Sequence, residues 1–373
     1  MKLELRRAGE DVVDLGFGNP DVPSPDAAVE KLAQAARDPR NHRYSASRGL
    51  ANLRGAICDL YARRFGVALD PEREAVTTIG AKEGLAHLMW VLAGAGDAVL
   101  VPDPSYPIHR FAPVLAGAEA VGFPLAGDVA EAIEDAVRNA RGRARAVVCS
   151  FPHNPTTAVA DLPQLQRIVD VARSHGLAVV HDFAYADLGF DGHRPPSILQ
   201  ADGAREVAVE LYTLTKGFSM AGWRVGFAVG NAGILAGLAR LKSYLDYGTF
   251  QPIQIAAIVA LKEASGYPDR VREIYRSRRD ALCRGLARAG WEIEPPRGTM
   301  FAWARIPEPF RGEGSHAFAL RLLRDAKVAV SPGAGFGPAG EGHVRFALVE
   351  NEQRIAQAVR GIRSLLGGGR RRS

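Results

Sequence analysis

One lysine of this chain is placed where it could react with carbonyl groups. Lys216 follows an apolar run, residues 207–211, that has the composition of a buried strand. Open α/β sheets bind their ligands beyond the carboxyl ends of their strands, and this lysine would lie there. Partial burial removes water from an amine and lowers its pKa, which favours the neutral, nucleophilic form. Only seven of the 47 basic residues are lysines, and arginine does not form a Schiff base at ordinary pH, so a lysine here indicates chemistry.

Groups that could bind phosphate surround this lysine. Thr213 and Thr215 carry hydroxyl donors, and Arg224 carries a planar guanidinium group. A reactive lysine beside a phosphate site suggests one cofactor, pyridoxal phosphate, bound as a Schiff base. Taken alone, this stretch leaves an alternative open, because a lysine after a strand is usually solvated and nearby hydroxyl residues usually cap a helix or a turn.

Two other segments could meet an anion. Gly80, Ala81 and Lys82 would begin a helix expected over residues 83–92, where free amides and the helix macrodipole favour phosphate. Gly18 belongs to a Gly/Pro-rich turn whose backbone N–H groups could serve the same purpose. Each motif is weak in isolation, since a glycine between a strand and a helix, or in a tight turn, is common.

The elements that must position these groups follow a repeating pattern of strands and helices. Near-continuous apolar strands, separated by helical segments such as residues 162–175, predict an α/β fold with a mostly parallel sheet covered on both faces. The strands are expected at residues 98–101, 146–151, 207–211 and 224–229, with one more that ends at Asp182. Asn154, Asp182 and Lys216 stand at or beyond the ends of three of these strands, so we expect them at one edge of the sheet.

After about residue 233 the chain is predicted to be largely helical. One long amphipathic segment covers about residues 252–288, and a smaller α+β unit follows, with a helix near residues 315–325 and Arg345 in a late strand. We therefore expect a large domain over residues 40–250 and a discontinuous small domain made of residues 1–39 and 251–373.

Composition limits the class of protein. The 373 residues, of which 47% are hydrophobic and 24% charged, are typical of a globular protein. Half of the formal charge of +6 comes from three arginines at the C-terminus, which predict a solvated tail and no nucleic-acid partner. Three cysteines without metal-ligand spacing predict buried, reduced thiols and no metal site. No stretch has the apolar core of a signal peptide or the length of a membrane span, so a cytoplasmic protein is expected.

Taken together and in this order, these residues resemble the class I/II aminotransferases, which are fold-type I pyridoxal-phosphate enzymes. The resemblance covers about residues 11–366. The strings GAKEGLAHLMWVL, PSYPIH, HDFAYADL, MAGWRVGF and SYLDYGTFQP are most similar to the alanine (glutamate–pyruvate) aminotransferases, and diaminopimelate aminotransferases share several of them. The resemblance implies a large domain with a mostly parallel central sheet, a smaller α+β domain, and a homodimer with shared active sites.

The resemblance assigns roles to residues around the lysine. It implies that Lys216 forms the Schiff base and that Asp182 pairs with the pyridinium nitrogen. Tyr185 and Asn154 would contact the ring hydroxyl, and Tyr106 would stack on the ring. The resemblance implies that residues from two loops and a helix N-terminus, together with one residue of a second subunit, bind the phosphate. The residue from the second subunit is Tyr44, and the others are Ala81, Lys82, Thr213, Thr215 and Arg224.

For the substrate, the resemblance implies that Arg345, helped by Gly18 and Asn154, binds the α-carboxylate. Lys216 would move the proton released from Cα, while the ring, kept protonated by Asp182, takes up negative charge. The expected reaction moves an amino group between an L-amino acid, with alanine the first choice, and a 2-oxo acid such as 2-oxoglutarate or pyruvate. Transamination of diaminopimelate or aspartate, a lyase reaction, and an inactive regulatory homologue stay open as alternatives.

Two departures from the family pattern bear on the cofactor site. Alanine stands at position 81 where relatives often have serine, although its backbone amide would still bind phosphate. Gly217, Phe218 and Ser219 follow the lysine in place of the commoner Ser-Tyr-Asn, which predicts a looser turn.

Overall fold

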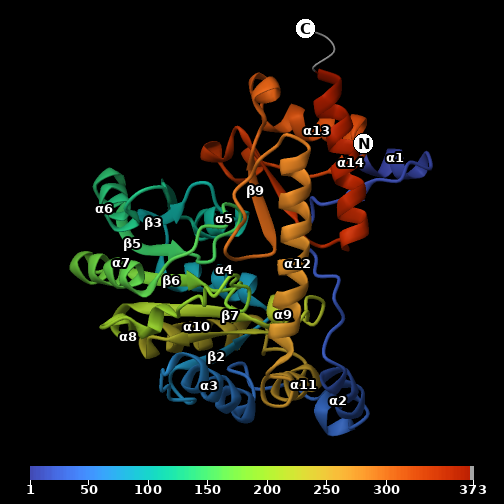
Figure 1. Cartoon of the computed structure of the whole chain (residues 1–373). Coiled ribbons are helices and arrows are strands. Elements are labelled where there is room, and N and C mark those ends of the chain that lie inside the picture. Colours follow the sequence, from blue (N-terminus) through green and yellow to red (C-terminus); the bar gives the residue numbers. More distant parts are fainter. Residues whose placement is uncertain (370–373) are drawn as a thin grey trace.

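The computed structural model describes residues 1–369 and contains one large sheet beside a smaller α+β unit (Figure 1). Arg370, Arg371 and Arg372, expected to form a solvated tail, lie outside the described residues. The large sheet has seven strands in the order β2 (Ala75–Thr78), β8 (Gly226–Gly230), β7 (Ala208–Thr213), β6 (Ala178–Asp182), β5 (Arg143–Cys149), β3 (Asp97–Pro102) and β4 (Glu119–Phe123). Of these seven strands, only β8 runs in the direction opposite to the other six, so the predicted mostly parallel sheet is confirmed.

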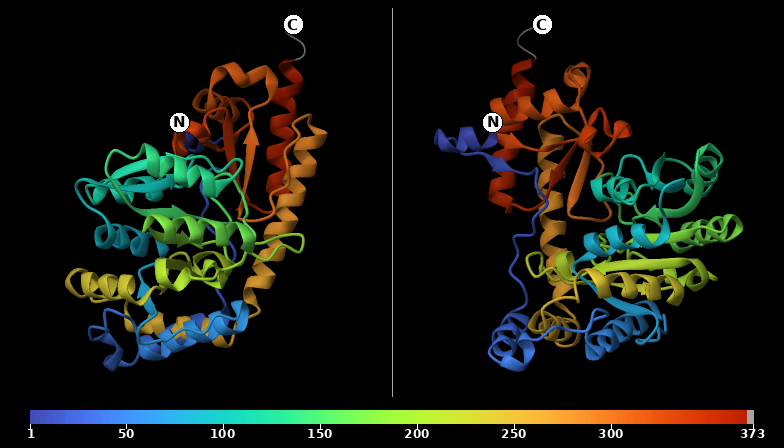
Figure 2. Two further views of the ribbon diagram at one scale, coloured as in Figure 1. Left: turned by 90° about the vertical axis from the view of Figure 1, so that its left-hand side faces the viewer. Right: turned by 180° about the vertical axis from the view of Figure 1, so that it is seen from behind.

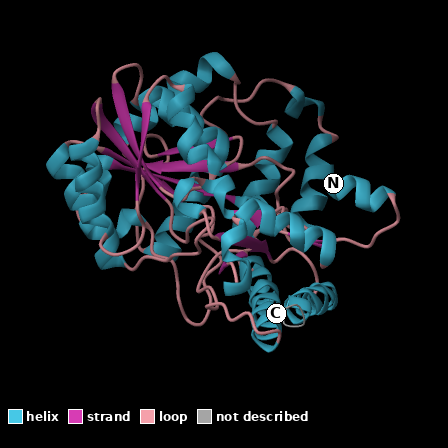
Figure 3. Cartoon of the chain, turned by 90° about the horizontal axis from the view of Figure 1, so that it is seen from above, coloured by secondary structure: helices cyan, strands magenta, loops and turns pink. Residues whose placement is uncertain are grey.

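Both faces of this sheet are apolar. Successive side chains of a strand point to opposite faces, and each face is covered by helices. Val147 and Val179 pack in a buried cluster with α3 (Ala51–Phe65), α6 (Val129–Asn139) and α7 (Leu162–His175). Val148 and Val180 pack on the other face with α4 (Ala81–Leu92), α5 (Pro107–Leu115) and α10 (Ala232–Leu245). Figure 3 shows helices on both sides of the twisted sheet. A strand buried on both faces must be apolar throughout, which is why continuous apolar runs predict these strands.

Some predicted elements differ from the structure. The strand expected from residue 224 begins at Gly226, because Arg224 has a positive φ of 55° and cannot be part of an extended strand. The helical segment expected over residues 252–288 is two helices, α11 (Gln251–Lys262) and α12 (Tyr267–Arg288). Pro268 lies in the first turn of α12, the one place where its missing N–H costs nothing, so a new helix must begin there.

The smaller unit is built on a three-stranded antiparallel sheet. It contains β9 (Phe301–Arg305), β12 (His343–Ala347) and β11 (Ser331–Pro332), and β1 (Val13–Asp14) pairs separately with β10 (Val328–Ala329). Helices α12, α13 (Ser315–Asp325) and α14 (Glu352–Gly369) enclose its apolar core. Figure 2 shows the long helix α12 extending from this unit to the base of the large sheet.

The N-terminal segment connects both parts of the molecule. After α1 (Lys2–Arg7) and β1 it continues to α2 (Asp26–Ala36), which packs on α11 beside the large sheet (Figure 2). The division into domains at residues 40 and 250 stays a prediction. All three cysteines are free and buried, as expected. Among residues 1–369, no helix is both long and apolar enough to cross a membrane.

Candidate active site

A cavity of about 560 Å³ lies at the carboxyl ends of the central strands. It is lined by the side chains and turns that follow β5, β6 and β7, together with the N-terminus of α4 and one face of the small sheet. The structure brings all but one of the predicted site residues together here, and these are Gly18, Ala81, Lys82, Tyr106, Asn154, Asp182, Tyr185, Thr213, Thr215, Lys216, Arg224 and Arg345. Residues separated by more than 300 positions therefore line one cavity.

Tyr44 is the predicted residue that this cavity does not include. Its side chain is 88% exposed, and its ring lies 5.1 Å from the ring of Tyr247, which is also exposed. Tyr244 and Phe250 are exposed nearby in sequence. Tyr44 therefore contributes nothing to the site of its own chain and lies on a surface rich in exposed aromatic rings.

The backbone around Lys216 presents its amine to the cavity. β7 ends at Thr213, whose hydroxyl accepts a hydrogen bond from the Thr215 amide at 3.2 Å and so caps the single turn α9 (Leu214–Gly217). Lys216 Nζ donates to the carbonyl oxygen of Gly18 at 3.1 Å. Burial, and then the positive charges of Arg345 and Arg224, lower the pKa of Lys216 to about 7. A large share of neutral amine is therefore present near neutral pH, as a nucleophile or base requires.

Asp182 has a buried partner, His109, that was not predicted from the sequence. His109 Nε2 lies 2.8 Å from Asp182 Oδ2, and both residues are buried. His109 is in the first turn of α5, three positions after Tyr106, and the two rings are 5.9 Å apart. This spacing could have indicated from the sequence that His109 faces the same cavity as Tyr106, because residues three positions apart at the start of a helix lie on one side of it. The pair holds the carboxylate in one orientation inside the cavity.

The residues predicted to bind phosphate lie together around the N-terminus of α4. Gly80, the residue before the helix, has φ 77°, and an added Cβ would lie 2.5 Å from Arg224 Nη2, so only glycine fits. Arg224 donates to the carbonyl oxygens of Ala221 and Ile79 at 3.2 and 3.3 Å. The hydroxyl groups of Thr213 and Thr215 are 2.8 Å apart. Free amides, hydroxyls and a guanidinium therefore converge, as at other anion sites on helix N-termini.

Arg345 is a buried cation that contacts neutral groups. Its Nη1 donates to Asn154 Oδ1 at 2.6 Å and its Nη2 to the Gly16 carbonyl oxygen at 3.2 Å. The guanidinium carbon lies 3.9 Å from the ring centroid of Phe301 and 4.6 Å from that of Phe336. Nε has no partner among the described residues, and burial lowers the pKa of Arg345 to about 10. A buried charge without a counter-charge is costly, so this position is suited to an anionic ligand.

The cavity as a whole has excess positive charge. Four cations line it, and Asp182 is the one carboxylate among its lining residues. Lys216 and Arg345 donate to uncharged oxygens, and the Lys82 amine lies 5.1 Å from the ring centroid of Tyr106. Such a set can bind two anions, one at the helix N-terminus and one at Arg345, with a reactive amine available.

Comparison with known proteins agrees with this geometry. A family model described as aminotransferase class I and II matches residues 10–362. Glutamate-pyruvate aminotransferase AlaC of Escherichia coli (strain K12) is 49% identical over 98% of this chain and 89% of its own length. An LL-diaminopimelate aminotransferase of Moorella thermoacetica is 42% identical over 98% of this chain and 93% of its own. The solved structure of a probable N-succinyldiaminopimelate aminotransferase from Thermus thermophilus superposes with a TM-score of 0.90, at 35% identity and 97% coverage of each chain.

Proposed function

This chain belongs to the class I and II aminotransferases, and from that premise we propose that it moves an amino group between an L-amino acid, with alanine the first choice, and a 2-oxo acid, with the help of pyridoxal 5′-phosphate. With alanine as the amino donor the acceptor would be 2-oxoglutarate, and in the reverse direction pyruvate would be the acceptor. The observation that carries the proposal is Arg345, a buried guanidinium without an anionic partner in the described part of the chain, next to a lysine whose pKa is lowered to about 7. The α-carboxylate of an amino acid would neutralise the charge of Arg345 while its amino group faces Lys216.

The residues present fit the proposed cofactor. The Ala81 amide, the hydroxyls of Thr213 and Thr215, and the guanidinium of Arg224 would bind its phosphate, as their convergence at the start of α4 supports. Asp182, buried beside His109, would keep a proton on the ring nitrogen. When bound, pyridoxal phosphate supplies an electron-withdrawing ring that stabilises negative charge on the substrate Cα.

The side chains around the substrate would have separate tasks. Arg345 and Asn154, already joined at 2.6 Å, would orient the α-carboxylate and so align the bond between Cα and its hydrogen. Lys216, with its pKa near 7, would take up that proton and return it. Burial raises the pKa of the Tyr185 phenol, which therefore stays protonated and can donate to an oxygen of the cofactor ring.

Alanine is proposed because the rest of the cavity lining offers mainly apolar contacts to a substrate side chain. Phe17, Pro20 and Ile108 are apolar members of its lining, and Asp182 is the one carboxylate among its lining residues. A methyl group needs no polar partner, whereas diaminopimelate carries a second ammonium that would need an acceptor of its own. Similarity to diaminopimelate aminotransferases keeps that substrate as the second candidate.

We further propose a cytoplasmic homodimer in which Tyr44 reaches the phosphate group of the other subunit. The exposed aromatic surface that contains Tyr44 and Tyr247 supports this, because such rings are enriched at interfaces. The test mixes two inactive variants, Tyr44→Ala and Lys216→Ala, under conditions that exchange subunits. Mixed dimers would regain one site with both residues, so activity should rise on mixing. If activity does not rise although mixed dimers form, Tyr44 does not act across the interface.

The visible absorption spectrum of the purified protein tests the proposed reaction. We expect a yellow protein whose colour fades when L-alanine is added and returns with 2-oxoglutarate or pyruvate. Lys216→Ala serves as the control and should lose the colour of the attached cofactor. Fading with LL-diaminopimelate but not with alanine would change the substrate, and return of colour without any 2-oxo acid would indicate a lyase. A protein that binds the cofactor but responds to no amino acid would contradict the proposal.

A further inference from the structure

A fully buried histidine and glutamate lie side by side directly behind the active site. His181 on β6 and Glu210 on β7 are paired across the two parallel strands, and both have 0% exposure. His181 is the residue before Asp182. None of the ion pairs among the described residues joins Glu210 to a lysine or arginine, and its carboxylate accepts hydrogen bonds from Tyr61 Oη and Ser197 Oγ, both at 2.7 Å.

The hydrogen bonds define the protonation of His181. The Phe151 amide donates to His181 Nε2 at 3.2 Å, so Nε2 presents its lone pair. The proton is therefore on Nδ1, which donates to Glu210 Oε2 at 2.8 Å. The Ile198 amide donates to the same carboxylate oxygen at 2.9 Å. Glu210 thus has four donors and holds a neutral imidazole in one tautomer and one orientation.

The imidazole in turn contacts the loop that reaches Arg345. Phe151 lies in the loop that follows β5, and three residues later Asn154 accepts the hydrogen bond from Arg345 at 2.6 Å. The ring of His181 also stacks on Phe183, with centroids 5.0 Å apart. A buried polar pair costs more to maintain than an apolar pair at the same place in a sheet. The presence of the polar pair His181 and Glu210 among the mostly apolar residues of two central strands indicates that the pair holds neighbouring groups in position.

We propose that His181 is a positioning residue whose Nε2, aligned by Glu210, fixes the loop of Phe151 and Asn154 and thereby the orientation of the Arg345 guanidinium. This inference rests on the proposed binding of the substrate carboxylate by Arg345. The hydrogen bonds run from Glu210 through His181 to the Phe151 amide, and then through the loop to Asn154. No group in this series touches substrate before Asn154.

Two substitutions of His181 separate its two hydrogen bonds. In His181→Asn the side-chain amide takes the place of Nδ1 and still donates to Glu210, but the Phe151 amide loses its acceptor. In His181→Gln the longer side chain brings an oxygen to the place of Nε2, so the Phe151 amide keeps an acceptor while Glu210 loses a donor. Both variants lose the imidazole, and we expect both to unfold at a lower temperature than the wild type.

The kinetic constants of the cofactor-loaded variants then test the proposal. We expect His181→Asn to raise KM for the amino acid roughly tenfold with a smaller change in kcat, and His181→Gln to keep KM within about twofold of wild type. Tyr61→Phe, which removes a different donor from Glu210, is the matched control and should lower stability without changing KM. Equal KM values in the Asn and Gln variants would overturn the proposal, because stability alone would then explain both.

A measurement on the unaltered protein does not depend on the folding of any variant. Nitrogen-15 NMR of histidine-labelled holoenzyme reports which ring nitrogen of His181 carries the proton. We expect a protonated Nδ1 and an unprotonated Nε2. A proton on Nε2 would overturn the proposal, because the Phe151 amide would then have no acceptor. This result is independent of whether alanine is the substrate, so a failure of the proposed function can be told apart from a failure of this inference.

Discussion

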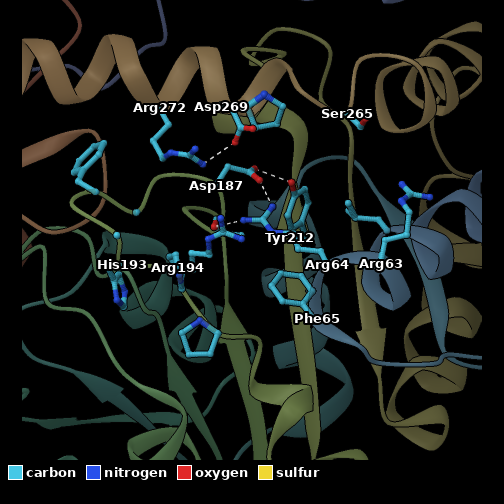
Figure 4. A pocket seen from close by; sticks show the side chains of 18 of the residues that line it. Arg63, Arg64, Phe65, Asp187, His193, Arg194, Tyr212, Ser265, Asp269 and Arg272 are labelled. Carbon is cyan, nitrogen blue, oxygen red and sulfur yellow. Dashed lines mark hydrogen bonds and ion pairs between the residues drawn. The ribbon is translucent and has the colours of Figure 1, made fainter.

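Two cavities share the turn that follows β6, and they differ in size and in charge. Ala184 and Tyr185 line the cavity around Lys216, whereas Ala186 and Asp187 line a second cavity between the end of α3 and the start of α12. We call the second one the reverse cavity. It measures about 840 Å³, against about 560 Å³ for the first, and five arginines line it (Figure 4).

The arginines of the reverse cavity are already neutralised or exposed to water. Arg272 pairs with Asp269 at 2.8 Å, and Arg64 pairs with Asp187, which also accepts from Tyr212 (Figure 4). Arg63 and Arg194 are exposed. Arg345, in contrast, is buried among neutral groups. If the proposed function is correct, an uncompensated buried charge indicates a ligand site better than cavity volume or the number of arginines does.

The wall between the two cavities explains one departure from the family pattern. The Asp187 carboxylate packs against Gly217, the residue after Lys216, and a Cβ at position 217 would overlap Asp187 Oδ2. Asp187 is held there by the Tyr212 hydroxyl at 2.7 Å. Glycine therefore replaces the commoner serine because the carboxylate occupies its space, and the turn is closely packed where a looser one was expected.

Among the substitutions that compare the two cavities, Asp182→Ala should have the largest effect on turnover. Without this carboxylate a proton on the cofactor ring is no longer stabilised, and kcat should fall by roughly 10²- to 10⁴-fold, as measured by steady-state rates with L-alanine. The control in the reverse cavity is Asp191→Ala, which removes the partner of Arg279 and should change kcat less than about twofold. A similar loss of rate in both variants would remove the distinction between the cavities.

The pH dependence of stability tests the buried charge of Lys216 directly. In the cofactor-free protein its pKa is about 7, against 10.5 for the ordinary side chain. Below pH 7 the amine is charged in both states and its burial destabilises the fold. Between pH 7 and 10.5 the unfolded chain binds more protons than the folded chain, so the free energy of unfolding rises with pH. Each pKa unit corresponds to about 1.4 kcal/mol, so the effect amounts to a few kcal/mol.

Lys216→Met isolates this contribution. Urea unfolding at pH 6, 8 and 10 should show the variant more stable than the wild type at pH 6, with the difference shrinking as the pH rises. Lys262→Met, at an exposed lysine, should show no such trend. A difference that is constant from pH 6 to 10 would mean that Lys216 has an ordinary pKa.

Arg345→Lys should affect substrate binding more than the cofactor. Lysine keeps the charge but loses the planar fork and the stacking between Phe301 and Phe336, so KM for the amino acid should rise by roughly ten- to hundredfold. The absorption of the bound cofactor should stay unchanged. Arg276→Lys in the reverse cavity is the control, because its pair with Glu273 is exposed. Normal KM in Arg345→Lys would contradict the assignment of the carboxylate site.

Much of the site could be predicted because it lies at the ends of buried strands. Asp182 and Lys216 follow apolar runs that must be strands when both faces of the sheet are covered, and parallel strands bring their carboxyl ends together. The same logic missed β4, a five-residue edge strand in which only Phe123 is fully buried. Helices α5 and α6, which flank it, were not predicted either.

The partners of the predicted residues were harder to find. The spacing of His109 from Tyr106 could have placed His109 at the cavity, but no local pattern identifies Asp182, 73 positions away in sequence, as its partner. The pairing of His181 with Glu210 depends on the register of β6 against β7, which composition does not determine. Tyr44 lies outside the cavity of its own chain, so its predicted role depends on a second subunit.

Arg272→Gln should have the smallest effect and is the most direct challenge to the comparison. Arg272 lines the reverse cavity, but its pair with Asp269 joins two exposed side chains on one helix, and such pairs contribute about 0–1 kcal/mol. We expect turnover within about twofold of wild type and a nearly unchanged melting temperature. KM should also stay within about twofold, and Arg345→Lys, measured in parallel, shows the size of a real effect on KM in the same assay. If Arg272→Gln lowered turnover tenfold without loss of stability, a paired surface arginine would matter as much as a buried, unpaired one, and absence of a counter-charge would no longer distinguish the two cavities.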